Sequence, residues 1–238
     1  FCENNQIKFL FLGHIQGDIA ENFIIRLFRG SGLDGLSSIS QLSDFRNIKL
    51  VRPLLDNTKD ELKNFLNEKN IQWFEDETNE DEKFLRNKVR KFFDTFEEKD
   101  LIQKRIKNST DEISQIRDLF DGLMLKEAEK ALELHKHGFF TINLPIFSKI
   151  EKKIALKILA LTLMEVGEKP YKPRLEKLKR FYDWIVNSNE KHKLNNFYGC
   201  SAKYFEDNKL AIYREGNSVN EHYNIELKTV LKTIFETK

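Results

Sequence analysis

The chain has 238 residues, 40% hydrophobic and 33% charged, with only 4 Pro and 10 Gly. This length suits one large or two smaller domains, and the composition excludes collagen, low-complexity disorder and a Gly/Ser linker protein. Forty Lys and Arg against 38 Asp and Glu leave a net charge of +2, too small for the whole chain to act as a nucleic-acid-binding surface. Any basic footprint must therefore be local.

The two cysteines, Cys2 and Cys200, lie far apart and form neither a disulfide framework nor a CxxC motif. This predicts a cytoplasmic protein. The apolar stretch 154–166 is interrupted by charges and falls short of the roughly 20 residues that cross a bilayer, so we expect no membrane span. Because the chain opens on Phe1 without a Met or a basic leader, we expect no secretory signal and a fragment of a longer protein.

The first elements predict an α/β fold. Residues 7–12 form a short apolar run, which indicates a strand buried on both faces. Apolar residues at i, i+4 spacing then predict a helix over 18–29, which Gly30 closes as a C-terminal cap. A strand, a turn and a helix in this order are typical of α/β domains.

A glycine-rich segment and a capped helix follow. Residues 30–36 hold three glycines, which either let the backbone approach a ligand or make a tight turn. Residues 48–55 read as an extended segment. Thr58 and Glu61 then form a capping box, which predicts the start of an amphipathic helix.

A further helix carries a basic stripe. Leu85, Val89 and Phe92 are predicted to share its apolar face. The opposite face of this helix carries Lys83, Arg86, Asn87 and Arg90. Guanidinium groups fixed on a helix pair well with RNA phosphates, and the alternative is an ordinary solvated face.

The rest of the chain predicts a connector and a second small domain. The pattern is helical over 95–137, as in a connecting hairpin or bundle. Beyond Gly138 we expect a strand, helices around 150–165 and 173–187, and strands near 196–200 and 210–214 joined by a turn at Asp207-Asn208. The predicted domains are 1–94, a helical connector over 95–137, a small α+β domain over 138–216, and a tail or the start of a further domain over 217–238.

Two groups of residues carry candidate chemistry. His14, Asp18 and Glu21 stand beside the first strand-to-helix turn, where phosphate and Mg²⁺ bind in many nucleotide-binding proteins. Acidic residues also favour the first turn of most helices, which is the alternative reading. The second group is Arg29, Gly30, Ser31 and Gly32, where an arginine beside glycines could receive phosphates or the glycines could simply cap a helix.

These segments together resemble the tRNA(Ile)-lysidine synthetase family of N-type ATP pyrophosphatases, the PP-loop proteins. Residues 14–22 and 26–36 are similar to its second motif block. Further similar segments follow in the family's order: Arg52-Pro53-Leu54 (R-P-L), Trp73–Asn79 (W-x-x-D-x-S/T-N), Arg86–Arg90 (R-N-x-I/V-R) and 199–215, the close of its substrate-binding domain. The family's S-G-G-x-D-S phosphate-binding loop does not occur in these residues, so we expect the middle of the enzyme, incomplete for catalysis.

The resemblance implies an α/β fold: the C-terminal part of a parallel-sheet PP-loop ATPase domain over 1–94, the helical connector and a small α+β substrate-binding domain. It implies a ligase that uses ATP and Mg²⁺ to adenylate the wobble cytidine of tRNA(Ile) with a CAU anticodon, after which L-lysine displaces AMP to give lysidine. It assigns His14, Asp18 and Glu21 to the reaction centre, with Asp18 toward Mg²⁺. Its remaining assignments are ATP contact by Arg29, Gly30, Ser31 and Gly32, and tRNA contact by Arg86, Asn87 and Arg90.

Two alternative functions stay open. The chain could be a tRNA-binding module without chemistry. A related PP-loop enzyme that thiolates tRNA would be expected to carry paired cysteines, which this sequence lacks. The sequence also leaves a homodimer open.

Overall fold

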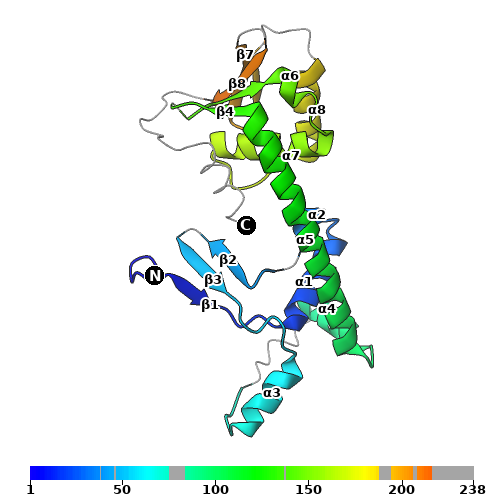
Figure 1. Cartoon of the computed structure of the whole chain (residues 1–238). Coiled ribbons are helices and arrows are strands. Elements are labelled where there is room, and N and C mark those ends of the chain that lie inside the picture. The colour runs from blue at the N-terminus through cyan, green and yellow to red at the C-terminus, as the bar shows by residue number, and fades with distance from the viewer. Residues whose placement is uncertain are drawn as a thin grey trace. The chain divides into compact units, whose positions relative to one another are not determined.

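The computed structural model describes residues 1–37, 39–45, 47–74, 84–136, 138–187, 194–205 and 208–215. Their contacts divide them into two units, Phe1–Leu119 and the residues from Phe120 on. Figure 1 labels the helices and strands along the chain. The boundary falls within the long helix α5 (Lys99–Ala131), whose two parts belong to different units. The domain boundaries expected from the sequence stay predictions.

The first unit contains a three-stranded sheet in the order β1-β3-β2. Strand β1 (Phe9–Phe11) is parallel to β3 (Ile48–Val51), which is antiparallel to β2 (Leu42–Phe45). The backbone N–H of Leu12 continues this pairing by donating to the carbonyl of Val51 at 2.8 Å. The ends of β1 and β3 therefore lie side by side, and the residues that follow them emerge at one edge of the sheet.

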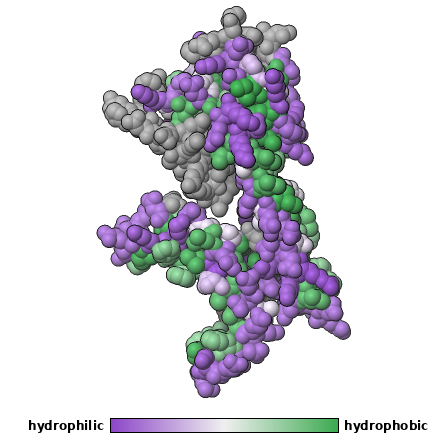
Figure 2. Space-filling model, viewed as in Figure 1, coloured by the Kyte–Doolittle hydropathy of each residue, from purple (hydrophilic) through white to green (hydrophobic). Residues whose placement is uncertain are grey.

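The expectation that the first strand is buried on both faces is wrong. Phe9, Leu10 and Phe11 are 52%, 39% and 68% exposed. Strand β1 pairs with a single neighbour, and its side chains belong to neither hydrophobic cluster of the described residues. Figure 2 shows hydrophobic atoms at the surface of this sheet.

Two helix boundaries in the first unit follow the predicted local signals, whereas the short helix α2 (Leu33–Leu36) was not predicted. The other described helices before α5 are α1 (Gln16–Phe28), α3 (Lys59–Glu68) and α4 (Leu85–Asp94). The predicted capping box is confirmed, because the N–H of Glu61 donates to Thr58 Oγ1 at 3.1 Å and the N–H of Thr58 donates to Glu61 Oε2 at 2.8 Å. The cap after α1 is confirmed as well, since Gly30 adopts φ +68°.

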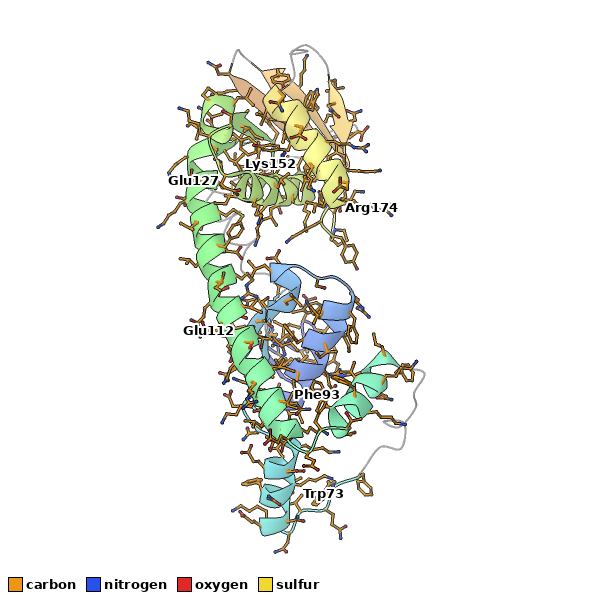
Figure 3. The ribbon with its side chains drawn as sticks, turned by 90° about the vertical axis from the view of Figure 1, so that its right-hand side faces the viewer. Trp73, Phe93, Glu112, Glu127, Lys152 and Arg174 are labelled. Carbon is orange, nitrogen blue, oxygen red and sulfur yellow. The ribbon has the colours of Figure 1, made fainter. Side chains whose placement is uncertain are left out.

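The predicted apolar face of α4 is wrong in part. Leu85 and Phe92 are 41% and 49% exposed, whereas Val89 and Phe93 are buried against Ala20 of α1. Figure 3 labels Phe93 in this small core. Because the true contact face is rotated from the predicted one, α4 turns its arginines toward α1. Within the described part of the basic stripe, Asn87 is buried and Arg86 and Arg90 are partly buried.

Helix α5 and the strand after it depart from the predicted connector. Residues 99–131 form a single helix of 33 residues, without the turn that a hairpin needs. The helical pattern was expected to continue to His137, which lies outside the described residues. Instead the chain becomes extended in β4 (Leu132–Leu134), which pairs antiparallel with β5 (Phe140–Asn143). Sheet pairing prevails there over the helical spacing of the side chains.

Within the described residues, the second unit contains a five-stranded antiparallel sheet, the second part of α5 and three further helices. The strand order is β4-β5-β8-β7-β6. The remaining elements are α6 (Leu144–Phe147), α7 (Lys152–Val166), α8 (Leu175–Asn187), β6 (Asn195–Phe197), β7 (Cys200–Phe205) and β8 (Lys209–Arg214). Helix α7 supplies much of the core, together with Phe140, Phe147, Phe181, Leu210 and Ile212. No helix within the described residues is long and apolar enough to cross a membrane.

Besides β4, strand β7 of this sheet was not foreseen. Tyr198 and Gly199 have φ of +60° and +79°, which places both in the left-handed region that a two-residue hairpin requires. Phe197 and Cys200 pair across this turn, so the predicted strand over 196–200 contains the end of β6, the two-residue turn and the first residue of β7. Asp207, in the other predicted turn, lies outside the described residues.

Cys200 is held in the core of the second unit. Its side chain is buried, and its thiol donates to the carbonyl of Leu163 at 3.4 Å. Burial, reinforced by the charge of Glu215, raises the pKa of the Cys200 thiol to about 12. Cys2 is a free thiol of intermediate exposure.

We therefore expect one of the two thiols to react with a thiol reagent in the folded chain at pH 8. At that pH the thiolate fraction of Cys200 is about three orders of magnitude below that of an ordinary cysteine. The measurement is the count of thiols labelled by iodoacetamide, with and without denaturant. Cys2→Ser should remove the fast phase and Cys200→Ser should leave it; fast labelling in the Cys2→Ser chain would contradict the burial.

Candidate functional site

Two carboxylates lie on one face of α1. Asp18 Oδ2 accepts a hydrogen bond of 2.8 Å from the backbone N–H of Ile15, which satisfies a donor at the helix start. Glu21 lies three residues later, which brings it to the same face of the helix. The capping role therefore fixes Asp18 at the helix start and leaves its second oxygen available to another partner.

Two arginines of α4 meet these carboxylates. Arg86 donates from Nη2 to Asp18 Oδ1 and from Nε to Glu21 Oε2, both at 2.6 Å. Arg90, four residues on, donates from Nε to Glu21 Oε1 at 2.6 Å, and its Nη2 lies 3.9 Å from Asp18 Oδ1. We call Asp18, Glu21, Arg86 and Arg90 the carboxylate–arginine cluster. It joins segments 65 to 69 residues apart in the sequence.

Burial is uneven within the carboxylate–arginine cluster. The Glu21 side chain is 7% exposed and that of Asp18 is 15% exposed, whereas those of Arg86 and Arg90 are 42% and 34% exposed. Two negative and two positive charges cancel, so no net charge is buried. Burial opposes the charge on Arg86, but its bond to Glu21 and the charges of Glu21 and Asp18 outweigh this and raise the pKa of Arg86.

His14 precedes this cluster, in the segment that links β1 to α1. Its Nδ1 is buried and has no hydrogen-bond partner among the described residues. A buried nitrogen without a partner is costly, so a ligand or water is the natural partner for it. The structure thus brings the three sequence-predicted residues close together along the chain. His14 lies just before α1, and Asp18 and Glu21 lie in its first two turns.

Asn87 is buried. It is 6% exposed, between the two arginines in sequence but on the buried side of α4. Its role in tRNA contact stays a prediction, and its burial indicates a part in holding the helix in place.

The structure does not bring the glycine-rich loop to the carboxylate–arginine cluster. Arg29, Gly30 and Gly32 are exposed and follow the last residue of α1, a rise of about 16 Å along the axis from Asp18. Helix C-termini carry partial negative charge, which does not favour phosphate. ATP contact by Arg29, Gly30, Ser31 and Gly32 therefore stays a prediction that this geometry does not favour.

Arg26 holds this loop in place, a role that the sequence analysis missed. Its Nε donates to Asn22 Oδ1 at 3.2 Å and its Nη1 donates to the carbonyl of Gly35 at 3.0 Å. A Cβ added at Gly35 would lie 2.6 Å from the Cβ of Ser31, so close packing requires a glycine there. The i, i+4 spacing of Asn22 and Arg26 was a signal in the sequence.

The residues present do not fit a magnesium ion at Asp18. One of its oxygens accepts from Arg86 and the other from the backbone of Ile15. A guanidinium group at 2.6 Å also repels a dication. Among the described residues no three His, Cys, Asp or Glu side chains gather as metal ligands. Magnesium coordination by Asp18 stays a prediction without support from this arrangement.

Arg52 is a further buried residue at the sheet edge, directly after β3. It is 8% exposed, and its Nη1 donates to the carbonyl of Ser40 at 3.0 Å and to Ser43 Oγ at 2.9 Å. Burial lowers its pKa, and its Nε has no partner among the described residues. The R-P-L segment was the signal in the sequence, but it did not indicate that the arginine would be buried.

Comparisons with known proteins agree with the resemblance seen in the sequence. Residues 1–94 match the family model of the PP-loop domain. The chain is 31% identical over 235 residues to the tRNA(Ile)-lysidine synthase of Wolbachia pipientis wMel, covering 93% of this chain and 51% of that protein. It is 29% identical over 237 residues to the one of Anaplasma marginale (strain St. Maries), covering 100% and 49%. The chain thus spans about half the length of these curated relatives.

The carboxylate–arginine cluster yields a stability prediction. Arg86→Ala should lower the free energy of unfolding by about 2 kcal/mol, because Glu21 stays buried with one partner fewer; solvent access to Arg86 keeps the loss below that of a fully buried pair. The measurement is urea denaturation followed by circular dichroism. Arg29→Ala is the matched control, since Arg29 is exposed, and should change stability by less than about 0.5 kcal/mol. Equal effects of the two substitutions would argue against the cluster as a stabilising contact.

Proposed function

We propose that the chain belongs to the tRNA(Ile)-lysidine synthase family and is the segment of such a ligase that carries the reaction centre. The reaction is the ATP-dependent adenylation of the wobble cytidine of tRNA(Ile) with a CAU anticodon, followed by displacement of AMP by L-lysine. The observation that carries this proposal is the carboxylate–arginine cluster, in which two separate family-like segments meet. The PP-loop match over residues 1–94 supports ATP as the nucleotide.

We assign the carboxylates a positioning role. Adenylation spreads negative charge over ATP's phosphates, and cations fixed before the reaction stabilise that charge best. Asp18 and Glu21 fix the guanidinium groups of Arg86 and Arg90 by hydrogen bonds, so that little reorganisation is needed when substrate binds. The arginine side chains keep a third or more of their surface exposed and can still approach a phosphate.

The second step needs a neutral lysine amine held near the activated base. Of the two cluster carboxylates, Asp18 is the more exposed, and we assign it to orient this amine. The unpartnered Nδ1 of His14 adds a polar group on the same segment. Mg²⁺ would accompany ATP through the phosphates themselves, with ligands outside the carboxylate–arginine cluster.

The alternative is a module that binds tRNA but catalyses no reaction, and tRNA binding alone is expected of both. Thiolation of tRNA is disfavoured, because Cys200 is buried and the sequence contains no CxxC pair. Light scattering on the purified chain distinguishes a monomer from a homodimer.

We expect the 238-residue chain to bind unmodified tRNA(Ile) with a CAU anticodon at least tenfold more tightly than the same tRNA with a GAU anticodon. The measurement is fluorescence anisotropy over a series of salt concentrations, since phosphate contacts make affinity salt-dependent. Arg86→Ala should make the salt slope shallower by no more than about 1, because its charge is already partly neutralised by two carboxylates. Equal affinity for both tRNAs would overturn the proposed substrate.

In a longer family chain that contains this segment, Asp18→Asn should lower tRNA adenylation at least a hundredfold. The amide can still accept the bond from Ile15 that caps α1, but it loses the charge that fixes Arg86. The measurement is release of AMP from α-labelled ATP with tRNA and lysine. Affinity for tRNA should stay within twofold, which separates a chemical defect from a binding defect. Full adenylation would remove Asp18 from the reaction centre.

A further inference from the structure

Two buried side-chain nitrogen atoms, His14 Nδ1 and Arg52 Nε, have no hydrogen-bond partner in the part of the chain that the structure describes. Both belong to segments that follow neighbouring parallel strands. Arg52 comes directly after Val51, the last residue of β3, and His14 comes three residues after Phe11, the last residue of β1. Because Phe11 and Val51 are register partners, both segments leave the sheet at the same edge (Figure 1). This carboxyl edge of parallel strands is where α/β sheets bind ligands.

The guanidinium group of Arg52 is engaged on one side. Its Nη1 donates to the carbonyl of Ser40 and to Ser43 Oγ, at 3.0 and 2.9 Å. Neither Nε nor Nη2 makes a hydrogen bond with a residue that the structure describes. These two nitrogens share the edge of the group on which two N–H bonds are parallel, and such an edge binds a carboxylate or a phosphate through two hydrogen bonds. The edge best suited to an oxyanion is therefore the one that the fold does not use.

The positive charge of Arg52 is not compensated either. The residue is 8% exposed, and it forms no ion pair with any described carboxylate. Burial consequently lowers the pKa of Arg52. In Arg86 the same edge donates to two carboxylates, and there the pKa is raised. A buried cation without an anion is costly, and an oxyanion on Nε and Nη2 would remove that cost.

The contacts around Arg52 hold this free edge in place. The backbone N–H of Arg52 donates to the carbonyl of Gln41 at 2.8 Å, so main chain and side chain are both bound to residues 40–43. Asp56 is engaged elsewhere, because it accepts from the Gln41 side chain at 2.9 Å and pairs with Lys107 at 2.9 Å. A donor group that is already fixed loses little conformational freedom when a ligand binds.

We propose that Arg52 binds an oxyanion through Nε and Nη2, in a subsite at the carboxyl edge of β1 and β3. The unpartnered Nδ1 of His14 is a second polar group at this edge. The geometry specifies two oxygen atoms that share a negative charge, which a phosphate group or the carboxylate of an amino acid supplies. The choice of ATP phosphates and L-lysine as the two sources rests on the proposed function.

The test follows the Arg52 Nε–H directly by ¹H–¹⁵N NMR of the 238-residue chain, with the signal assigned by correlation to the Arg52 backbone. We expect pyrophosphate or L-lysine to shift this signal saturably, and sodium chloride at matched ionic strength to leave it in place. The internal control is the Nε–H of Arg117, which already donates to Asp118 Oδ1 at 3.0 Å and should not shift.

The ligands distinguish the two sources. A shift with pyrophosphate identifies a phosphate subsite. A shift with L-lysine that L-lysinamide does not reproduce identifies a carboxylate subsite. No saturable shift with either ligand, or an equal shift of the Arg117 signal, would overturn the proposal.

A variant tests the two parallel N–H bonds. Arg52→Lys keeps the positive charge but lacks the bidentate edge, so it should bind the ligand that shifts the Arg52 signal about tenfold or more weakly. Ser43→Ala is the matched control: it removes one contact of Nη1 and leaves the free edge, and affinity should stay within about threefold. The measurement is isothermal titration calorimetry, with circular dichroism to establish that each variant folds. Unchanged affinity in Arg52→Lys would show that charge alone suffices, against the proposal. The NMR titration uses the unsubstituted chain and decides the matter if Arg52→Lys does not fold.

The two proposals fail separately. If the chain prefers the CAU anticodon but the Arg52 signal responds to neither ligand, this inference fails and the proposed function stands. If the Arg52 signal responds but the chain binds both tRNAs equally, the oxyanion subsite stands and the proposed substrate fails.

Discussion

The first unit depends on the burial of Glu21 against two arginines. A carboxylate that is 7% exposed is tolerated only when its oxygens are fully paired, and here Arg86 and Arg90 each take one of them. This requirement fixes how α4 is rotated against α1 and which apolar residues of α4 can enter the core. Val89 and Phe93 are buried and Leu85 is exposed because the arginine face must point at α1. The ionic contact thus selects the hydrophobic one.

Local signals in the sequence predicted most helix and strand positions. Thr58 with Glu61, and Gly30 after α1, act through neighbouring backbone atoms, so they are visible without the fold. Features that depend on contacts between distant segments could not be predicted from the sequence. The pairing of β4 with β5 depends on residues on both sides of Gly138, and the turn at Tyr198 requires a positive φ in a residue that rarely adopts one.

The candidate site shows the same division. His14, Asp18 and Glu21 could be grouped from the sequence, because they share one turn and one helix. That Arg86 and Arg90 join them could not, since helical spacing shows which residues share a face but not what that face contacts. The glycine-rich loop shows the reverse. Its glycines look like a phosphate site in sequence, yet Gly30 closes a helix and Gly35 makes room for Ser31.

For the same reason, whether a charged side chain is available to a ligand depends on its ion-pair partners in the fold. A net charge of +2 over 238 residues suggests a neutral surface, and by composition alone α4 is the more promising basic helix. In the fold, the arginines of α4 are matched by carboxylates of α1. Arg174, Lys177 and Arg180 at the start of α8 form no ion pair with any described residue. What decides whether a cation is available to a phosphate is the nearest carboxylate in space, and a sequence gives that distance only within one helix.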